Sequence, residues 1–422
     1  MLFAAPRNVH GGWVSTAKED RPRVRAWAFA WLYFSEGAPI GFIWWGLPTL
    51  LRGQDVSVER ITALTAALVL PWTLKFVVAP IVDVCRGPRW GLRHWVTGAQ
   101  AGMGVFLLPL ALWAEQVAPV VWMVLLLAHA CCAALQDVAI DALAIASVPS
   151  SARGRVNAWM QFGMLVGRGL FGGGAILIAS RYGWGAVMAG LVVAVWCSLA
   201  ILWAFVPEPE IDSQGSRSAL KGFAHTLGMA LRKRSTWLGL CFGLVGGAGF
   251  EACGAIAGPM LVDLGTGEET IAGFFGIVVV AAMIAGAAMG GRWSDRHDRS
   301  QAVGIALVAL SVLVGMVGGA SWMGGGPVVV MVALAIVYLA IGVFTASCYA
   351  WFMDLTDARL GATQFSAFMA ATNGCEAWAA WTGGRLVATA GYGTALIVLA
   401  ALSLAGIPLL RASRVRLGGT RG

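Results

Sequence analysis

The sequence carries little charge for its length. Acidic and basic residues make up 12% of the 422 residues, whereas hydrophobic residues make up 59%. A soluble globular protein has roughly a quarter charged residues. So few charges leave too little polar surface to cover a globule in water, which excludes an ordinary soluble fold. The mean hydropathy of +0.76 instead indicates a chain that is surrounded by lipid.

The sequence also lacks the motifs of enzymes and metal proteins. It contains no HExxH and no GxSxG motif, and its eight cysteines form no CxxC pair. The glycines around Arg168 are not followed by the Gly-Lys-Ser/Thr of a phosphate-binding loop. We therefore expect no enzyme activity, no cofactor and no metal site. The residues before Arg25 lack the apolar core of a signal peptide.

Long apolar windows recur along the whole chain. A helix needs about twenty apolar residues to cross the hydrocarbon of a bilayer, and many windows have this length. They predict an all-α integral membrane protein with twelve transmembrane helices. The predicted spans lie near residues 27–50, 61–83, 94–113, 119–148, 157–180, 184–205, 236–262, 270–291, 301–320, 327–352, 363–388 and 391–411.

A polar segment rich in Pro, Ser and Gly interrupts this pattern at residues 207–235 and reads as a linker. It divides the spans into six before and six after, as expected for a chain built from two related halves. The predicted layout is a cytoplasmic tail at 1–25, a six-helix bundle at 26–206, the linker, a second six-helix bundle at 236–411 and a cytoplasmic tail at 412–422.

Basic residues are distributed unevenly between the predicted loops. Alternate loops hold only Arg52, Arg60 and Arg181, whereas the other loops and both tails carry most of the remaining arginines and lysines. Loops rich in Lys and Arg stay on the cytoplasmic side. Both termini are therefore expected in the cytoplasm, in a multi-pass protein of the inner (cytoplasmic) membrane. The basic residues of these cytoplasmic loops then account for the net charge of +8, and we expect no nucleic-acid partner.

An acidic residue followed by arginines occurs after both the second and the eighth predicted span. The first group includes Asp83 and Arg89, and the second includes Asp295, Arg296 and Arg299. Such groups could lock the two halves together at the cytoplasmic face through charge-assisted hydrogen bonds. Alternatively, the arginines only set the topology.

Several ionisable side chains fall inside predicted spans. Each costs roughly 2.5–3.5 kcal/mol at the bilayer centre on insertion scales, so packing in lipid alone would not favour them. They predict a wet central cavity in which they face one another. These residues are Glu36, Lys75, Asp137, Asp141, Arg168, Glu251, Glu376 and Arg385.

Two aspartates and one lysine suggest an ion pair in the first half. Asp137 and Asp141 are four residues apart and share one helical face, and Lys75 is expected at a similar depth. Lys75 is therefore predicted to pair with one of the two aspartates. The pair could serve function, or it could be a static contact that fixes helix packing.

Glu36 and Glu251 are predicted at inner depths of the first and seventh spans. A carboxyl group in an apolar pocket can hold a proton near neutral pH. With Asp137 and Asp141, these glutamates are the candidates for proton coupling. The alternative is that each is a buried, protonated side chain that only forms hydrogen bonds.

Other residues in the spans are candidates for binding a solute. Arg168 could hold a carboxylate or a phosphate, or it could neutralise Asp137. Trp44 and Trp378 could stack on a ring, although most tryptophans in such a chain anchor helices at the membrane interface. The candidate substrate-binding residues are Lys75, Arg168, Trp44, Gln364, Asn373, Glu376 and Trp378.

Several segments resemble one branch of the major facilitator superfamily, which contains the muropeptide permease AmpG, the acetyl-coenzyme A transporter and the RhtX/FptX siderophore transporters. The matching segments are LYFSEGAP at 32–39, LPW at 70–72, QDVAID at 136–141 and GATQFS at 361–366. In addition, Gly291, Asp295, Arg296 and Arg299 resemble the superfamily motif G-x-x-x-D-R-x-G-R-R. The resemblance implies the major facilitator fold, in which the first, seventh and eleventh helices line a central cavity.

The resemblance also implies a secondary transporter, acting as a monomer with protons and a small molecule as partners. The run LPTLLR at 47–52 is closer to the siderophore transporters, so the expected activity is proton-coupled import of a bulky polar solute such as a ferric siderophore. The alternatives are a permease for anhydromuropeptides or acyl-coenzyme A-like solutes, an exporter of drugs or metabolites, and a membrane assembly factor that transports nothing.

Overall fold

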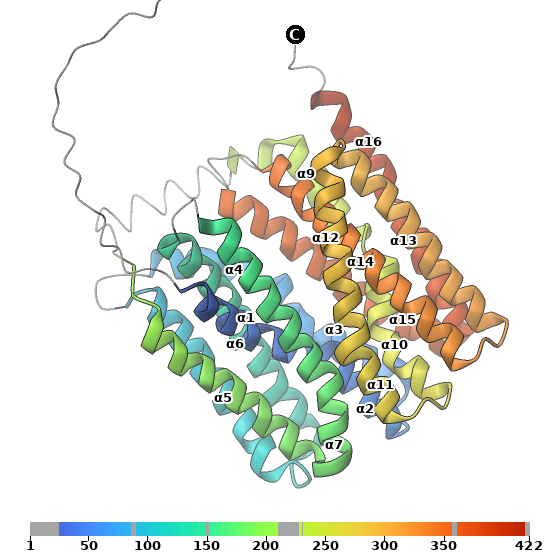
Figure 1. Cartoon of the computed structure of the whole chain (residues 1–422), viewed down its shortest axis with the longest axis horizontal. Coiled ribbons are helices and arrows are strands. Elements are labelled where there is room, and N and C mark those ends of the chain that lie inside the picture. The colour runs from blue at the N-terminus through green and yellow to red at the C-terminus, as the bar shows by residue number, and fades with distance from the viewer. Residues whose placement is uncertain are drawn as a thin grey trace, which may run out of the picture.

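The fold consists of helices joined by short turns (Figure 1). The computed structural model describes residues 25–85, 90–148, 152–209, 228–229, 231–356 and 361–417, and no strand occurs among them. The all-α prediction is therefore confirmed. The helices are α1 (Ala26–Gly41), η1 (Phe42–Gly46), α2 (Leu47–Gly53), α3 (Val58–Thr73), α4 (Lys75–Val84), α5 (Leu92–Trp113), α6 (Pro119–Ser147), α7 (Arg153–Phe205), α9 (Arg234–Val245), α10 (Ala248–Asp263), α11 (Glu268–Gly273), η3 (Phe274–Val279), α12 (Val280–Arg296), α13 (Arg299–Trp322), α14 (Pro327–Leu355), α15 (Gly361–Ser403) and α16 (Gly406–Leu417).

The helices are long enough and apolar enough for a multi-pass membrane protein. Among the described residues, nine helical stretches meet both conditions. Two of them have 51 and 50 residues, and each contains one glycine with a positive φ, at Gly183 (78°) and Gly391 (81°). Because this backbone conformation is not helical, each of these stretches is two helices joined at a glycine. Residues with a β carbon rarely adopt it. Together with the stretch from Ala26 to Gly53, this gives the twelve predicted spans.

The helices form two groups that lie side by side. Most of the helices from α1 to α7 pack on one another, and so do most of those from α9 to α16 (blue to green and yellow to red in Figure 1), whereas α3 packs mainly on α15. We call the end at which α1 begins and α16 ends the terminal end. The opposite end, which carries the turns at residues 54–57 and 264–267, is the distal end. The two groups touch where α3 meets α15, where α2 meets α10, and where α7 meets α11 and η3.

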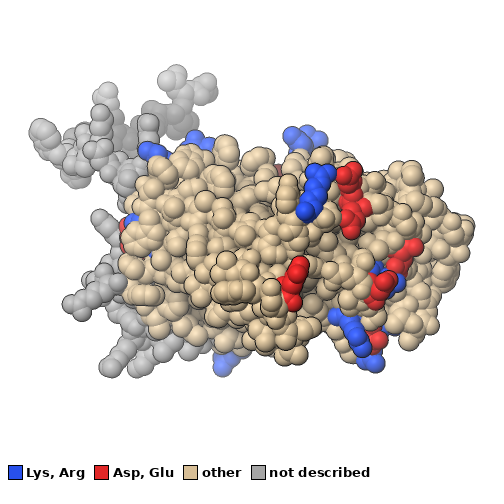
Figure 2. Space-filling view, turned by 90° about the horizontal axis from the view of Figure 1, so that it is seen from below, with Lys and Arg blue, Asp and Glu red and all other residues tan. Residues whose placement is uncertain are grey.

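The surface agrees with a lipid environment. The space-filling view shows only a few charged side chains on a largely uncharged face (Figure 2). Many large apolar side chains are exposed along the helices, such as Leu112 at 64%, Val193 at 61% and Ile277 at 71%. Apolar side chains in these positions fit contact with acyl chains rather than with water.

Glycines bring α1 and α7 into backbone contact. A β carbon at Gly37 would lie 2.8 Å from the carbonyl carbon of Met164, and one at Gly167 would lie 2.9 Å from the amide nitrogen of Ala38. Small residues allow transmembrane helices to approach this closely. In the sequence, Glu36 directly precedes Gly37 and Arg168 directly follows Gly167, the glycines of this contact.

Three of the spans that are interrupted carry residues of the predicted site, and the eighth span also contains a π-helical turn, η3. The first span contains the π-helical turn η1, the second breaks at Leu74 between α3 and α4, and the seventh breaks at Gly246–Gly247 between α9 and α10. π-helical turns occur frequently at functional sites. Trp44 lies in the first interruption, Lys75 directly follows the second, and Glu251 lies about one turn after the third.

The structure differs from the predicted layout at the last helix. This helix breaks after Ser403 and continues as α16 to Leu417, past the predicted end at residue 411. Most of the predicted linker and the first tail lie outside the described residues.

Candidate functional site

A buried charged cluster lies between α1, α4 and α6. We call Tyr33, Glu36, Lys75, Asp137 and Asp141 the first cluster. The ammonium group of Lys75 donates a hydrogen bond to Asp137 Oδ2 at 2.8 Å, and the two side chains are only 12% and 7% exposed. The hydroxyl of Tyr33 donates to Asp141 Oδ1. The predicted ion pair therefore exists, and its acidic member is Asp137.

Glu36 is the third carboxyl of the first cluster. It is 3% exposed and lies within hydrogen-bonding reach of Asp137. Its Oε2 atom is buried and has no hydrogen-bond partner among the described residues. The first cluster thus brings three carboxyl groups together with a single ammonium group, and a buried charge without a partner is costly.

A second cluster joins the two groups of helices. It consists of Trp44 on η1, Arg168 on α7, Glu251 on α10 and Glu376 on α15. The indole N–H of Trp44 donates a hydrogen bond to Glu376 Oε1, and the guanidinium of Arg168 lies over the Trp44 ring at 5.2 Å. Glu251, which is 7% exposed, is close enough to Arg168 and Glu376 for electrostatic interaction.

This arrangement answers one question that the sequence left open. Arg168 was expected either to face a solute or to neutralise Asp137. Asp137 is paired with Lys75, whereas Arg168 lies with Trp44 and the two glutamates of the second cluster. Among the described residues, no hydrogen bond or ion pair involves the guanidinium group of Arg168.

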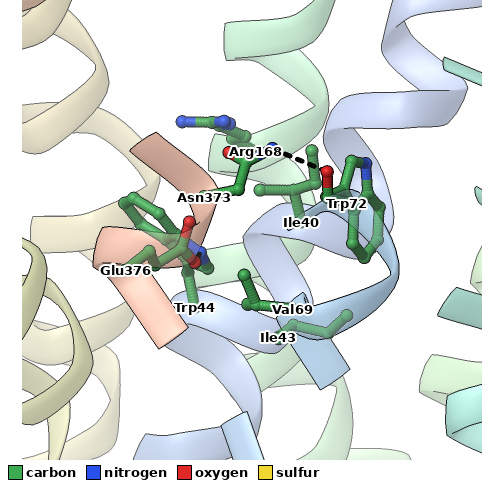
Figure 3. A pocket seen from close by; sticks show the side chains of 8 residues that line it. All are labelled: Ile40, Ile43, Trp44, Val69, Trp72, Arg168, Asn373 and Glu376. Carbon is green, nitrogen blue, oxygen red and sulfur yellow. Dashed lines mark hydrogen bonds between the residues drawn. The ribbon is translucent and has the colours of Figure 1, made fainter. Parts of the chain in front are cut away.

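A pocket opens beside the second cluster, with about 330 Å³ of empty space that includes open solvent. Figure 3 shows that its wall combines side chains of α1, η1, α3 and α7 from the first group with two side chains of α15 from the second. The amide of Asn373 donates a hydrogen bond to the carbonyl oxygen of Trp72 at 3.3 Å, which links the two groups again. The lining residues are Ile40, Ile43, Trp44, Val69, Trp72, Arg168, Asn373 and Glu376.

Three of the predicted substrate-binding residues lie outside this pocket. The ammonium group of Lys75 is held by Asp137 in the first cluster. The amide of Gln364 donates to Thr236 Oγ1 at 2.8 Å, and its side chain is buried where α15 begins. The indole of Trp378 donates to the carbonyl oxygen of Leu244 at 2.8 Å. Trp72, in contrast, lines the pocket although it was not among the predicted substrate-binding residues.

The predicted gate at the terminal end joins helices of one group only. Arg299 contacts Asp354 at 2.6 Å and Asp295 at 3.8 Å, and all three residues belong to α12, α13 and α14. Among the described residues these contacts do not join the two groups in this conformation, and the lock between the groups at this face stays a prediction. Arg296 is exposed at the end of α12. The side chain of Asp83 and the whole of Arg89 lie outside the described residues.

Ion pairs between the two groups occur at the distal end instead. Three ion pairs, given at the end of this paragraph, join the two groups there, and we call them the distal latch. Within the second group, the hydroxyl of Tyr392 donates a hydrogen bond to Asp263 Oδ2 at 2.7 Å. Arg385 was predicted near the bilayer centre, but the structure pairs it here. The contacts of the distal latch are Arg52–Asp263 (2.6 Å), Arg181–Glu269 (3.0 Å) and Arg385–Glu59 (3.7 Å).

Exposed ion pairs contribute little individually, about 0.2–1 kcal/mol. The Arg181–Glu269 pair is of this kind, since its side chains are 61% and 80% exposed. The side chains of Arg52 and Asp263 are only 26% and 29% exposed. The ion pairs between the groups that the described residues show all lie at the distal end, so this conformation is held together there.

A family model described as the Major Facilitator Superfamily matches residues 29–374. Apart from Glu376, this region includes every residue of the two charged clusters and every residue that lines the pocket. The match therefore extends over most of the chain and over nearly all of the site.

Solved transporter structures have a similar fold. A D-xylose–proton symporter superposes with a TM-score of 0.72 at 14% identity, covering 91% of this chain and 95% of that one. The nucleoside transporter NupG gives 0.67 at 13% identity, with 92% and 99% covered. A peptide transporter (POT) solved with sulfate gives 0.67 at 13% identity, with 93% and 95% covered. At these identities the likeness establishes the fold alone.

Proposed function

The chain belongs to the major facilitator superfamily, and we propose that this membrane transporter couples the import of a polar organic solute to protons. The solute would occupy the pocket between the two groups of helices, and the buried carboxyl groups would carry the protons. Both termini would face the cytoplasm of a cell with this chain in its inner membrane, as the distribution of basic loop residues favours.

The observation that supports proton coupling is an imbalance of buried charge. The two clusters contain five carboxyl groups, from Glu36, Asp137, Asp141, Glu251 and Glu376. Only two cationic side chains, one in each cluster, lie among them. Leaving the remaining carboxylates ionised and buried would cost several kcal/mol each. Protons that bind to these carboxylates neutralise them and remove this cost, and they can bind and leave when water enters the clusters.

The position of the distal latch supports alternating access. With the groups joined at the distal end, a solute would exchange with the terminal end, which the proposed topology places in the cytoplasm. Import would require the latch to open toward the outside and to close again around the loaded pocket. Trp44–Glu376 and Asn373–Trp72 join the two groups at the pocket, so a solute that inserts there would act on the same contacts.

We propose a ferric siderophore as the first solute to test, on the resemblance of the segments at 32–39 and 47–52 to siderophore transporters. Cells that express the chain would be given labelled ferric siderophores, and in parallel labelled anhydromuropeptide, with and without a proton uncoupler. Accumulation of a siderophore that the uncoupler abolishes is the expected result. Accumulation of anhydromuropeptide would replace the solute, and accumulation of neither would contradict import of both.

Replacing Glu36 by glutamine should uncouple transport from the proton gradient. The amide cannot exchange a proton, yet it fits the space of the carboxyl group. For one proton per solute, a gradient of one pH unit supports about tenfold accumulation, and this ratio should fall to about one in the variant. Exchange of solute across liposome membranes without a gradient should continue. Unchanged accumulation in Glu36→Gln would remove Glu36 from the coupling role.

A further inference from the structure

We propose that the pocket beside the second cluster selects a solute with one carboxylate group on a flat ring system, and that Arg168 and Trp72 bind this carboxylate. The inference rests on the proposed function, because the same pocket would carry the solute, but it names a smaller solute than the ferric siderophore proposed above. It depends on three features: unpartnered donors, the charge of the cluster and the aromatic wall.

Two residues that line the pocket carry buried hydrogen-bond donors without acceptors. Arg168 Nε is buried and has no hydrogen-bond partner among the described residues, and its guanidinium lies over the Trp44 ring, within electrostatic reach of Glu251 and Glu376. The indole nitrogen of Trp72 is also buried and unpartnered, on a side chain that is 6% exposed. Buried donors without acceptors are costly, so a ligand that supplies acceptor oxygens to both should be favoured.

Among the described residues, no hydrogen bond joins these donors to the nearby acceptors, one of which, Glu251 Oε2, is also buried without a partner. Glu376 Oε1 accepts from the indole of Trp44, and the carbonyl oxygen of Trp72 accepts from Asn373. A carboxylate in the pocket could accept two parallel hydrogen bonds from a guanidinium, which is the pairing that arginine forms best. Arg168 is therefore available to a ligand, whereas Lys75, the other buried cation of the clusters, is already paired with Asp137.

The charge of the second cluster limits the ligand to one negative charge. Arg168 provides one positive charge, and Glu251 and Glu376 carry no charge in the proton-loaded state of the proposed transport cycle. A single carboxylate then makes the site neutral. A phosphate monoester, with a charge of about −1.5 to −2 at pH 7, would leave an uncompensated charge in the pocket.

The remaining wall suits a flat apolar body. Trp44 and Trp72 present aromatic surface, and Ile40, Ile43 and Val69 complete the wall (Figure 3). Aromatic side chains pack favourably on other rings in offset or edge-on geometry. A ring system that carries a carboxylate would thus fill the pocket with its body and reach the unpartnered donors with its oxygens.

Binding to the purified full chain in detergent tests this inference with a matched pair of probes, indole-3-acetate and indole-3-acetamide. The two have the same shape and differ in charge. The acetate should bind at least about tenfold more tightly than the amide, as expected for charge-assisted hydrogen bonds. Phenyl phosphate should bind more weakly than indole-3-acetate.

Variants then assign the preference to residues. Arg168→Gln should remove the preference for the acetate, Arg168→Lys should retain part of it, and Trp72→Phe should weaken acetate binding severalfold while amide binding stays the same. Arg60→Gln changes an exposed arginine at the distal end and should behave like the parent chain. A monodisperse elution profile and an unchanged melting temperature would show that each variant is folded.

Three outcomes would overturn the inference: equal binding of acetate and amide, no binding of either probe, or a retained preference in Arg168→Gln. Tighter binding of phenyl phosphate would overturn the restriction to one charge. Because binding is measured without a membrane gradient, it can succeed where proton-coupled uptake fails. The failure of the inference and the failure of the proposed function are therefore separate results.

Discussion

Replacing Lys75 by alanine should abolish transport and lower the free energy of unfolding by about 3–5 kcal/mol. The substitution removes the partner of Asp137 and leaves its carboxylate buried beside Glu36 and Asp141. Breaking a buried ion pair on one side costs this much because the other charge stays in place without compensation. The measurements are solute exchange in liposomes and the melting temperature in detergent.

A double variant separates a functional pair from a structural one. Asp137→Asn combined with Lys75→Ala removes both charges, so most of the lost stability should return. Transport should remain absent, because the first cluster would lack both its cation and one of its proton-binding groups. Recovery of transport in the double variant would mean that the pair only fixes helix packing. Lys75→Arg, which keeps the positive charge, is the matched control.

Much of the fold follows directly from the sequence. The length of each apolar window determines where a helix can cross the bilayer, and the described helices agree with the predicted spans to within a few residues. The interruptions inside the helices were not predictable in the same way. Residues 42–46 read FIWWG and are as apolar as their neighbours, so nothing in their composition marks the π-helical turn.

The charged residues of the site were also visible in the sequence, because charge within an apolar window is expensive. Their partners were not. Asp137 and Asp141 share a helical face, and the choice between them depends on Tyr33, which reaches Asp141 from a helix far away in sequence. No spacing rule predicts that contact.

The sequence also could not show which neutral side chains line the pocket, and Trp72 and Trp378 are examples. Both are tryptophans in apolar windows, yet one lines the pocket and the other donates to the carbonyl of Leu244. In a soluble helix, alternation between polar and apolar residues would reveal the inner face. A membrane helix is apolar toward both lipid and protein, so the face of each tryptophan had to come from the packing.

A close contact between two glycines joins the two groups of helices. Gly173 on α7 lies where the two groups cross: a β carbon there would be 2.7 Å from the Cα atom of Gly276 in η3. Since the neighbouring atoms are backbone, they cannot move aside as a flexible side chain would. Gly173→Val should therefore prevent closure at the distal end and reduce transport by about 100-fold, a loss of about 2.7 kcal/mol.

The adjacent Gly174 provides the matched control, because a β carbon there would meet only Leu170 Cδ1 at 3.6 Å. Gly174→Val adds the same volume to the same helix and should transport normally. Closure is measured by the labelling rate of a cysteine at position 43, in a chain without its native cysteines, using an impermeant maleimide on the distal side. Faster labelling and lost transport in Gly173→Val alone are expected, since the glycine contact and the distal latch hold the same closed state. Equal behaviour of the two valine variants would contradict a role for this crossing in closure.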